Sequence, residues 1–286
     1  MAVINGTFFN DTRVGTNFSD SIRTFNGNDY IFSSRGNDFI SGGFGFDTAD
    51  YRFIGQGITL GSTGIVNKGT AGRDRLSSVE RIIGPVGRNN TINAASSFNS
   101  PVSIVANLGA NRLQVNNIPG LGTQSFTVQN FASVAGTNRN DTIIGNNLNN
   151  RLDGRSGNDF ISGGNGNDSL IGGNGSDRLI GGFGNDALIG SIGGFGERDV
   201  LTGGSGADRF VVGNAFRSFY RGNGFATITD FNAFAGDRID VFGSRNSYNI
   251  RFARVSGGFN LDTIISLGND AIAVVQDTTI SRFSLI

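Results

Sequence analysis

The sequence predicts an all-β protein, a parallel β-solenoid built from nonapeptide repeats. Asp recurs every nine residues in two separate arrays, and an apolar residue follows two positions after almost every one of these aspartates. The intervening segments are rich in glycine, of which the chain holds 46. Self-similarity at a short fixed period is the sequence signature of stacked repeat architectures, and no helical periodicity of convincing length competes with it.

Composition narrows the classes of function. The 286 residues include neither Cys nor His, which excludes disulfides, thiol catalysis, His-dependent triads and HExxH zinc sites. Positive and negative charges balance at 23 each without a basic stripe, so a nucleic-acid partner is not expected. No apolar run approaches the roughly 18 residues of a membrane span, and residues 1–15 lack the features of a signal peptide.

The first array occupies residues 1–50. Its aspartates are Asp11, Asp20, Asp29, Asp38 and Asp47. The apolar residues two positions later are Ile22, Ile31, Ile40 and Ala49, whereas Arg13 breaks the rule. Because side chains alternate between the faces of a strand, the three residues after each Asp form a short strand with only the middle side chain facing inward.

Residues 51–135 carry no nonapeptide repeat. They contain the β-prone pieces GITL, VSIVANL, NRLQVNNI and QSFTVQNF, separated by Gly and Asn. We expect an irregular β-solenoid segment here, with coils that bind no ion. A separate β-sandwich inserted between the arrays is the alternative.

The second array occupies residues 136–211. Its aspartates are Asp141, Asp159, Asp168, Asp177, Asp186, Asp199 and Asp208. Asn150 fills one place in the series, and the insert SIGGFGER lengthens the step before Asp199. Three consecutive turns have the pattern Gly-Gly-x-Gly-x-Asp, with glycines at Gly163, Gly164, Gly166, Gly172, Gly173, Gly175, Gly181, Gly182 and Gly184.

Residues 212–286 are expected to form a β-rich cap. The strand candidates are RFVVG, ATITDF, DRIDVFG, YNIRFARV, DTIISLG and AIAVVQ, the first of which overlaps the end of the array. A cap is needed because an open solenoid end would leave a sheet edge unpaired.

Stacking of the coils predicts a metal. Two nonapeptides close one coil, which places Asp11 beside Asp29, and Asp159 beside Asp177, about 4.7–4.9 Å apart in the stacking direction. Glycines permit positive φ and let backbone carbonyls crowd together in the turns. Carboxylates and carbonyls are the oxygen ligands that Ca²⁺ prefers, so we expect several calcium ions at the aspartates and glycines of the two arrays.

At these residues the sequence resembles the RTX family of hemolysin-type calcium-binding proteins, with its Gly-Gly-x-Gly-x-Asp-x-U-x nonapeptide. The resemblance extends to DRLSSVERIIG at 74–84 and ATITDFNAFAGDRIDV at 226–241. It implies a parallel β-roll with Ca²⁺ between successive turns, a secreted or cell-surface location, and export by type I secretion machinery that reads a C-terminal signal, here 269–286. The chain departs from the family in its neutral charge and in turns that lack leading glycines, at 24–29 and 33–38.

Other functions remain open at this point. A calcium-assisted polysaccharide lyase would need ingredients such as Asp50, Arg52 and Asp74, but nothing in their spacing marks a site, and we expect no enzyme. A carbohydrate- or surface-binding module is a further alternative. Ice binding is disfavoured because the outward positions Thr142, Arg151 and Phe160 begin no threonine ladder.

Overall fold

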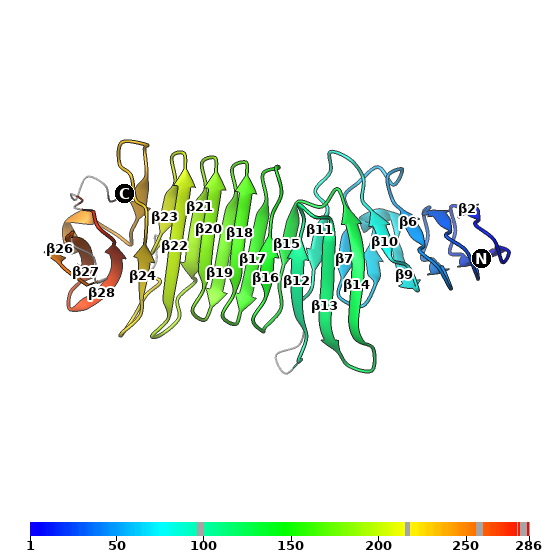
Figure 1. The fold of residues 1–286 in the computed structure, drawn as a ribbon, viewed down its shortest axis with the longest axis horizontal. Helices are drawn as coiled ribbons and strands as arrows, with labels where there is room; N and C mark the ends of the chain where they lie inside the picture. Colours follow the sequence, from blue (N-terminus) through cyan, green and yellow to red (C-terminus); the bar gives the residue numbers. More distant parts are fainter. Residues whose placement is uncertain (96–99, 215–217, 256–259, 279, 281–284, 286) are drawn as a thin grey trace. The chain divides into compact units, whose positions relative to one another are not determined.

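The computed structural model describes residues 1–95, 100–214, 218–255, 260–278, 280 and 285. These residues form an all-β fold with no α-helix among them, and they divide into two compact units, Met1–Ala135 and Gly136–Ile286. Within each unit the strands build two sheets that are mostly parallel (Figure 1). The predicted fold class is confirmed.

The first unit begins with the coils of the first array and continues into a longer-stranded segment. Its elements are β1 (Val3–Asn5), β2 (Thr12–Val14), β3 (Ser21–Arg23), β4 (Tyr30–Phe32), β5 (Phe39–Ser41), β6 (Thr48–Asp50), β7 (Thr59–Gly61), β8 (Ile65–Asn67), the 3₁₀ turn η1 (Gly69–Ala71), β9 (Arg73–Ser77), β10 (Arg81–Ile83), β11 (Thr91–Asn93), β12 (Ser103–Asn107), β13 (Arg112–Ile118), β14 (Gly122–Gln129) and β15 (Ser133–Ala135).

Consecutive strands of the first array alternate between two sheets, so two strands make one coil. Strand β3 pairs in parallel with β5, and β4 with β6, and the paired residues, such as Ile22 and Ile40, lie one coil apart. This is the predicted register. Arg13 occupies an inward slot of β2, near the start of the array, and its guanidinium forms an ion pair with Asp11 at 2.8 Å, which explains how a charged residue fits there.

Antiparallel strands interrupt the segment 51–135, which therefore differs from a simple run of coils. Strand β8 pairs antiparallel with both β7 and β9, and β13 does so with β12 and β14. Parallel pairing persists around them, between β6, β10 and β14 and between β7, β11 and β15. Without the glycine turns, tight hairpins connect neighbouring strands more directly than crossovers do.

The second unit begins with the second array. Its elements are β16 (Thr142–Ile144), β17 (Arg151–Ser156), β18 (Phe160–Asn165), β19 (Ser169–Asn174), β20 (Arg178–Phe183), β21 (Ala187–Ser191), β22 (Arg198–Ser205), β23 (Arg209–Val211), β24 (Phe225–Ile228), β25 (Arg238–Asp240), the 3₁₀ turn η2 (Arg245–Ser247), β26 (Tyr248–Ala253), β27 (Asp262–Leu267) and β28 (Asp270–Val275).

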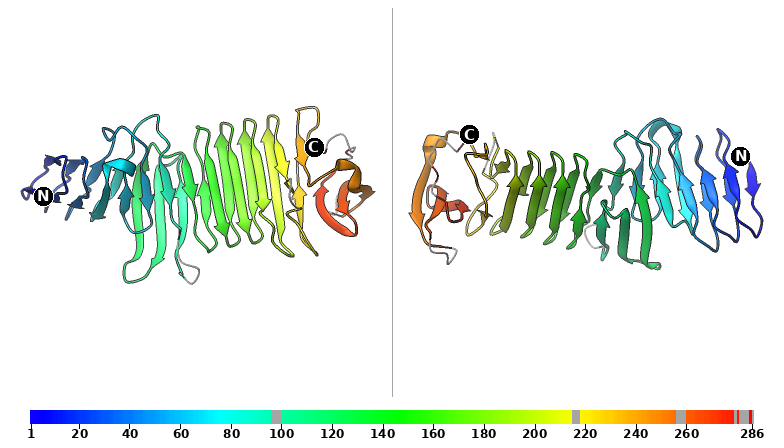
Figure 2. Two further views of the ribbon diagram at one scale, coloured as in Figure 1. Left: turned by 180° about the vertical axis from the view of Figure 1, so that it is seen from behind. Right: turned by 45° about the horizontal axis from the view of Figure 1, so that its top comes forward.

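The second array has the same coil construction but longer strands than predicted. Leu152 pairs with Leu170 and Ile161 with Leu179, in each case with the equivalent residue of the next coil. Figure 2 shows the strands of this array, in green to yellow-green, lying side by side. Strands such as β18 run six residues because pairing continues through the glycines, where Gly164 faces Gly182. Turn backbone groups thus find partners in the next coil, as buried backbone must.

One apolar residue per nonapeptide fills the inside of the second array. Ile143, Leu152, Ile161, Leu170, Leu179, Leu188, Leu201 and Phe210 all have 0% exposure. Such a core is one side chain wide, and each buried Leu or Ile contributes only about 1.5–3 kcal/mol. Interactions in the turns must therefore contribute much of the stability of the fold.

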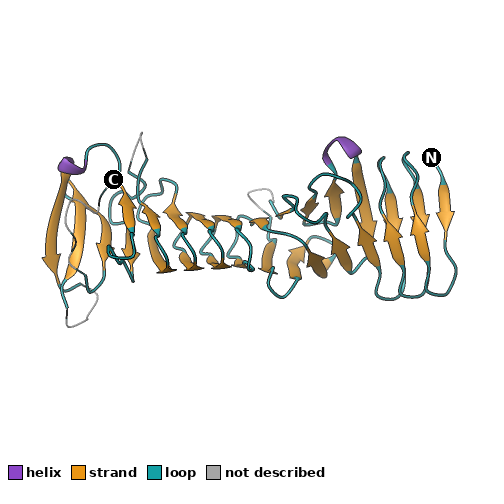
Figure 3. Ribbon diagram, turned by 90° about the horizontal axis from the view of Figure 1, so that it is seen from above, coloured by secondary structure: helices purple, strands orange, loops and turns teal. Residues whose placement is uncertain are grey.

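An antiparallel meander of β26, β27 and β28 follows the second array and joins it through parallel pairing of β28 with β24. Short 3₁₀ turns are the only helical pieces among the described residues (Figure 3), and none of these has the length and apolar character needed to cross a membrane. The proposed C-terminal signal at 269–286 falls partly on residues outside those described, at 279, 281–284 and 286.

Candidate metal centre

The aspartates of the arrays point into the turns and stack in columns. The backbone N–H of each Asp donates a hydrogen bond to Oδ1 of the Asp one coil further along, at 2.7–2.9 Å. This contact joins Asp11 to Asp29, Asp20 to Asp38, Asp29 to Asp47, Asp141 to Asp159, Asp159 to Asp177, Asp168 to Asp186, Asp177 to Asp199 and Asp186 to Asp208. One carboxylate oxygen per turn is thereby fixed, and the second is free to face the inside of the turn.

That second oxygen has no partner in most of the turns. Within the described residues, Oδ2 is buried and accepts no hydrogen bond in Asp29, Asp47, Asp159, Asp168, Asp177, Asp186 and Asp208. Each of these aspartates is at most 3% exposed. A buried carboxylate oxygen without a partner raises the free energy of the folded state. A cation bound at each of these seven positions would remove that cost.

The leading glycine of each turn leaves room at that oxygen. A Cβ built on Gly163 would lie 2.1 Å from Oδ2 of Asp168 and 2.7 Å from the carbonyl oxygen of Gly181. At Gly172 the corresponding distances are 2.2 Å to Asp177 Oδ2 and 2.5 Å to the Gly190 carbonyl oxygen. A carboxylate oxygen and a carbonyl oxygen from the next coil therefore converge where a side chain would stand.

The following glycines serve the stacking of the turn itself. Gly182 has φ of +120° and Gly184 has φ of +128°, a region that L-residues with a Cβ rarely adopt. A Cβ on Gly182 would also lie 2.1 Å from the carbonyl oxygen of Gly164. Two sets of the predicted glycines thus have different roles. Those that keep the coils close are Gly164, Gly166, Gly173, Gly175, Gly182 and Gly184, and those that open the space at the carboxylate are Gly163, Gly172 and Gly181.

The electrostatics of the columns favour a positive charge. Burial, opposed by one backbone hydrogen bond and aided by neighbouring carboxylates, raises the pKa of Asp159 to about 8 and that of Asp177 to about 7. Burial likewise raises the pKa to about 6 in Asp47, Asp168, Asp186 and Asp208. When they are ionised, neighbouring carboxylates in a column repel one another, and a divalent cation bound between them would replace this repulsion with attraction.

Side chains alone do not complete a coordination shell. Among the residues that the structure describes, no three acidic side chains gather closely enough to hold a metal ion. The donors must therefore combine one or two carboxylates with the crowded carbonyls, and a shell made only of oxygen suits Ca²⁺.

Other aspartates have partners at the same oxygen. Thr7, Thr16 and Thr137 stand where the second glycine would be, and each donates its backbone N–H and its hydroxyl to Oδ2 of Asp11, Asp20 and Asp141. The Thr7 N–H bond lowers the pKa of Asp11. Burial opposes the same effect in Asp20, whose pKa is nevertheless lowered by bonds from Ala2 and Thr16.

Tyrosine, asparagine and lysine complete the set of partnered turns. The Tyr220 hydroxyl donates to Asp199 Oδ2 at 2.6 Å, and Asn150 Oδ1 accepts from the Asn146 N–H at 2.8 Å. Asp38 Oδ2 contacts Lys68. The sequence pattern predicts the same role, that of a calcium ligand, for all twelve aspartates. The Thr in Gly-Thr-x-x-x-Asp turns was a readable signal for three of them, whereas Lys68 and Tyr220 come from distant parts of the chain.

The three residues considered for lyase chemistry have structural partners. Arg52 pairs with Asp50 at 2.6 Å and also donates to the Tyr30 hydroxyl. Asp74 is 1% exposed and accepts from Ser33 and Lys68. Asp50 and Asp74 thus belong to different contact networks.

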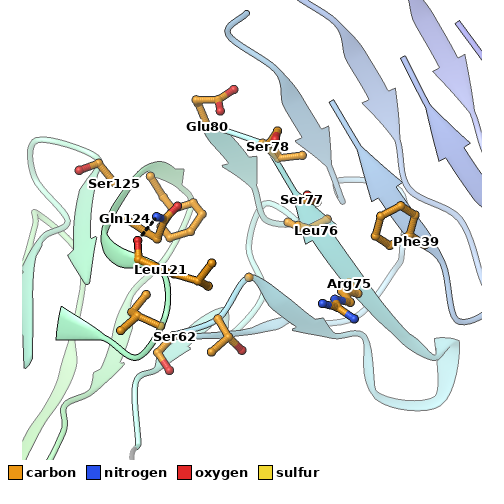
Figure 4. Close-up of a pocket in the computed structure, with 15 residues that line it drawn as sticks. Phe39, Ser62, Arg75, Leu76, Ser77, Ser78, Glu80, Leu121, Gln124 and Ser125 are labelled. Atoms are coloured by element: carbon orange, nitrogen blue, oxygen red, sulfur yellow. Dashed lines mark hydrogen bonds between the residues drawn. The ribbon is translucent and has the colours of Figure 1, made fainter. Parts of the chain in front are cut away.

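A hollow of about 590 Å³ lies in the first unit, beside β9. Phe39, Arg75 and Leu121 line it, together with hydroxyl and amide side chains that include Ser62, Gln124 and Ser125 (Figure 4). Gln124 Nε2 donates to the Leu121 carbonyl at 3.0 Å. An aromatic ring beside several hydroxyls and two opposite charges, those of Arg75 and Glu80, offers a polar ligand both stacking and hydrogen bonds.

The coils and their carboxylate columns define a parallel β-roll with repeat-borne cation sites, and comparison with known proteins gives the class. The profile of the RTX calcium-binding nonapeptide repeat matches residues 5–40, 14–49, 135–170, 162–194 and 192–214. The chain therefore carries RTX calcium-binding nonapeptide repeats of the hemolysin type in several copies, as the resemblance predicted.

The chain was also compared with curated protein sequences and with solved structures. No curated protein sequence matches the chain. Among solved structures, the crystal structure of the extracellular lipase LipA from Serratia marcescens matches with a TM-score of 0.27 and 18% identity. The match covers 98% of this chain and 39% of the lipase, so the chain spans less than half of that protein's length.

Proposed function

We propose that this chain binds several Ca²⁺ ions in its glycine-rich turns and that these ions complete its fold. The observation that carries the proposal is the set of seven buried aspartate oxygens without a partner among the described residues. Asp29, Asp47 and the five aspartates of the second array would supply the carboxylates, and turn carbonyls such as those of Gly181 and Gly190 the remaining ligands. Calcium supplies the positive charge that the columns lack.

Binding and folding are coupled in this account. Each nonapeptide orders nine residues of backbone around a single inward apolar side chain, so apolar burial offsets only a small part of the conformational entropy lost on folding. Backbone hydrogen bonds offset part of the remaining entropic cost, and the bound ions offset more of it. A metal that binds the folded state but not the loose chain stabilises folding directly.

Asp177→Asn tests the proposal at one turn. The substitution keeps the shape of the side chain but removes the charge whose oxygen lacks a partner. We expect one fewer bound ion in equilibrium dialysis and a lower melting temperature in calcium, by a few degrees. In chelator we expect the opposite shift, since a neutral side chain there relieves the repulsion with Asp199 and Glu197.

Asp141→Asn is the matched control. Its carboxylate already accepts two hydrogen bonds from Thr137, so this variant should lose stability both in calcium and in chelator without losing an ion. Equal ion counts for the wild type and Asp177→Asn would exclude calcium from that turn.

Coupling of folding to calcium binding would serve export of the chain. RTX repeats suggest secretion, and extracellular calcium sites commonly have dissociation constants of about 10⁻⁴–10⁻³ M. Such sites stay empty in a cytoplasm poor in calcium and fill outside the cell. We propose that the chain passes the type I machinery while loosely structured and folds outside, where it serves a structural or adhesive role and not catalysis. Fusion of the C-terminal residues to a reporter, with export scored in a type I host, tests the route.

Carbohydrate binding is a second candidate function. The hollow beside β9 supports it, because hydroxyl and amide side chains line the hollow together with the Phe39 ring. Titration calorimetry with acidic and neutral polysaccharides, on the wild type and Phe39→Ala, would test it. Unchanged heats for the two proteins would remove the hollow from consideration. Chain cleavage of an acidic polysaccharide by the wild type would instead favour the lyase.

A further inference from the structure

Lys68 is the only lysine of the chain, and its side chain is completely buried. Its ammonium lies 2.5 Å from Asp74 Oδ1 and 3.2 Å from Asp38 Oδ2. It also donates to the Ser34 carbonyl at 2.6 Å and lies 3.5 Å from the Ser33 hydroxyl. These polar contacts of the ammonium are all to oxygen atoms, which belong to two carboxylates, a carbonyl and a hydroxyl.

Asp38 and Asp74 occupy successive places in one column of turns. The Asp20 N–H donates to Asp38 Oδ1 at 2.9 Å, and the Asp38 N–H donates in the same way to Asp74 Oδ1 at 3.0 Å. The second oxygen of Asp38 therefore corresponds to the oxygen that has no partner in Asp29 and Asp47. Here it contacts the ammonium.

The segment that delivers Lys68 is itself a turn of the repeat type. Residues 69–74 read GTAGRD, and the last three stack on residues 36–38. A Cβ on Gly72 would lie 2.1 Å from the Gly36 carbonyl oxygen, and the Arg73 N–H donates to Asn37 Oδ1 at 2.8 Å. The step from Asp38 to Asp74 is twice the usual coil length, because β7 and β8 are inserted.

We propose that the Lys68 ammonium is a covalently attached substitute for Ca²⁺ between the turns 33–38 and 69–74. The inference rests on the proposed function, since it assigns a permanent cation to one position of a series otherwise filled by calcium. It follows that β5 and β9 are held together before calcium arrives. This junction would give the first array an ordered edge from which calcium-dependent coils can grow.

The inserted hairpin makes the substitution possible. Strand β8 ends at Asn67, and the Lys68 N–H donates to the Gly72 carbonyl at 2.8 Å. The side chain consequently points from the hairpin into the column. A monovalent ammonium against two carboxylates leaves less positive charge than Ca²⁺ would, and hydrogen bonds from Ser33 and the Asp38 N–H to Asp74 offset part of that deficit.

Hydrogen exchange of the full-length protein in chelator tests the proposal. The variants are Lys68→Met, which keeps the length of the side chain without its charge, and Arg35→Met, which removes one exposed charge from the same turn. We expect amides of β5 and β9 to exchange at least about tenfold faster in Lys68→Met than in the wild type, and Arg35→Met to match the wild type.

Two further variants separate charge from packing. Lys68→Met combined with Asp38→Asn should recover protection, because Asp38, whose Oδ2 has Lys68 as its partner, is then neutral, while Asp74 keeps its hydrogen bonds from Ser33 and the Asp38 N–H. Lys68→Ala leaves space for an ion, so it should bind one calcium more than the wild type in equilibrium dialysis and regain protection of β5 and β9 in calcium. Equal exchange in Lys68→Met and the wild type, or no extra ion and no recovery in these variants, would overturn the proposal.

The outcomes also separate this inference from the proposed function. If the wild type binds no calcium at any turn, the proposed function fails and Lys68 substitutes for nothing. If the wild type binds calcium but Lys68→Met exchanges like Arg35→Met, the proposed function stands and only the role of Lys68 is overturned.

Discussion

At the scale of the residue, the oxygen that faces each turn determines what the turn can bind. Thr137 donates two hydrogen bonds to Asp141, whereas the glycine in the corresponding place, Gly164, leaves Asp168 Oδ2 without a partner. A change from Gly to Thr at one position thus converts an open carboxylate into a satisfied one. The Gly-Thr turns are among the first turns of each array.

Gly163→Ala tests the space that the leading glycine leaves. The new Cβ would lie 2.1 Å from Asp168 Oδ2, so the carboxylate must move. We expect a loss of about 1–3 kcal/mol in the free energy of unfolding measured in calcium, as for an overpacked core, together with weaker calcium binding.

Gly61→Ala serves as the control, because the nearest atom to its Cβ is the Ile65 carbonyl oxygen at an ordinary 3.5 Å. If Gly163→Ala were as stable and bound calcium as tightly as Gly61→Ala, the space that Gly163 leaves beside Asp168 Oδ2 would have no role in calcium binding.

Sequence reasoning at this scale reached the identity of the aspartates but not their differences. The regular spacing gives every Asp the same place in a turn, and stacking of every second repeat follows from it. Lys68 and Asp38 lie far apart in the sequence, however, as do Tyr220 and Asp199, so their contacts are long-range. Contacts of that kind depend on inserted strands and on the end of the array, which have no period to read.

At the scale of the element, the repeat turn is both the connection between strands and the binding site. Its glycines continue the parallel pairing in β18 and β20, which the expected three-residue strands did not include. The antiparallel pairs around β8 and β13 were also not predicted as such, since short β-prone pieces carry no information on strand direction. Composition did locate β13, which lies within NRLQVNNI, and most of β14, which overlaps QSFTVQNF, whereas β8 lies in none of the expected pieces.

The turns also predict an unusual dependence on pH. Folding raises the pKa of Asp159 to about 8 and that of Asp177 to about 7, against about 3.9 in an unfolded chain. The folded state without calcium therefore binds more protons than the unfolded state between about pH 4 and 8, so its stability falls as the pH rises through that window. The expected loss is about 1 kcal/mol or more for each such aspartate.

Thermal unfolding in chelator at pH 5 and pH 8 checks this dependence. The melting temperature should be higher at pH 5, and Asp177→Asn should show a smaller difference between the two values. In calcium the order should reverse, because protons compete with the ion for the same oxygen. A higher melting temperature at pH 8 in chelator would contradict the burial of ionised columns.

At the scale of the whole molecule, the two units differ in their need for cations. Within the described residues, the first unit has two aspartates with an unpartnered Oδ2, Asp29 and Asp47, and also holds Lys68. The second unit has five such aspartates. The neutral balance of charge therefore does not mean that the columns are neutralised. In the part of the chain that the structure describes, Arg side chains pair with some aspartates, such as Asp11, but with none of these seven.

A calcium titration of the chelated full-length protein tests the central claim most directly, with far-UV circular dichroism and calorimetry recorded in parallel. We predict a cooperative gain of β signal as several ions bind, up to seven for the unpartnered aspartates of the described residues, with the larger share of the gain from the second unit. A full β signal in chelator with no heat of calcium binding would contradict the account, because the columns would then be stable without the ion.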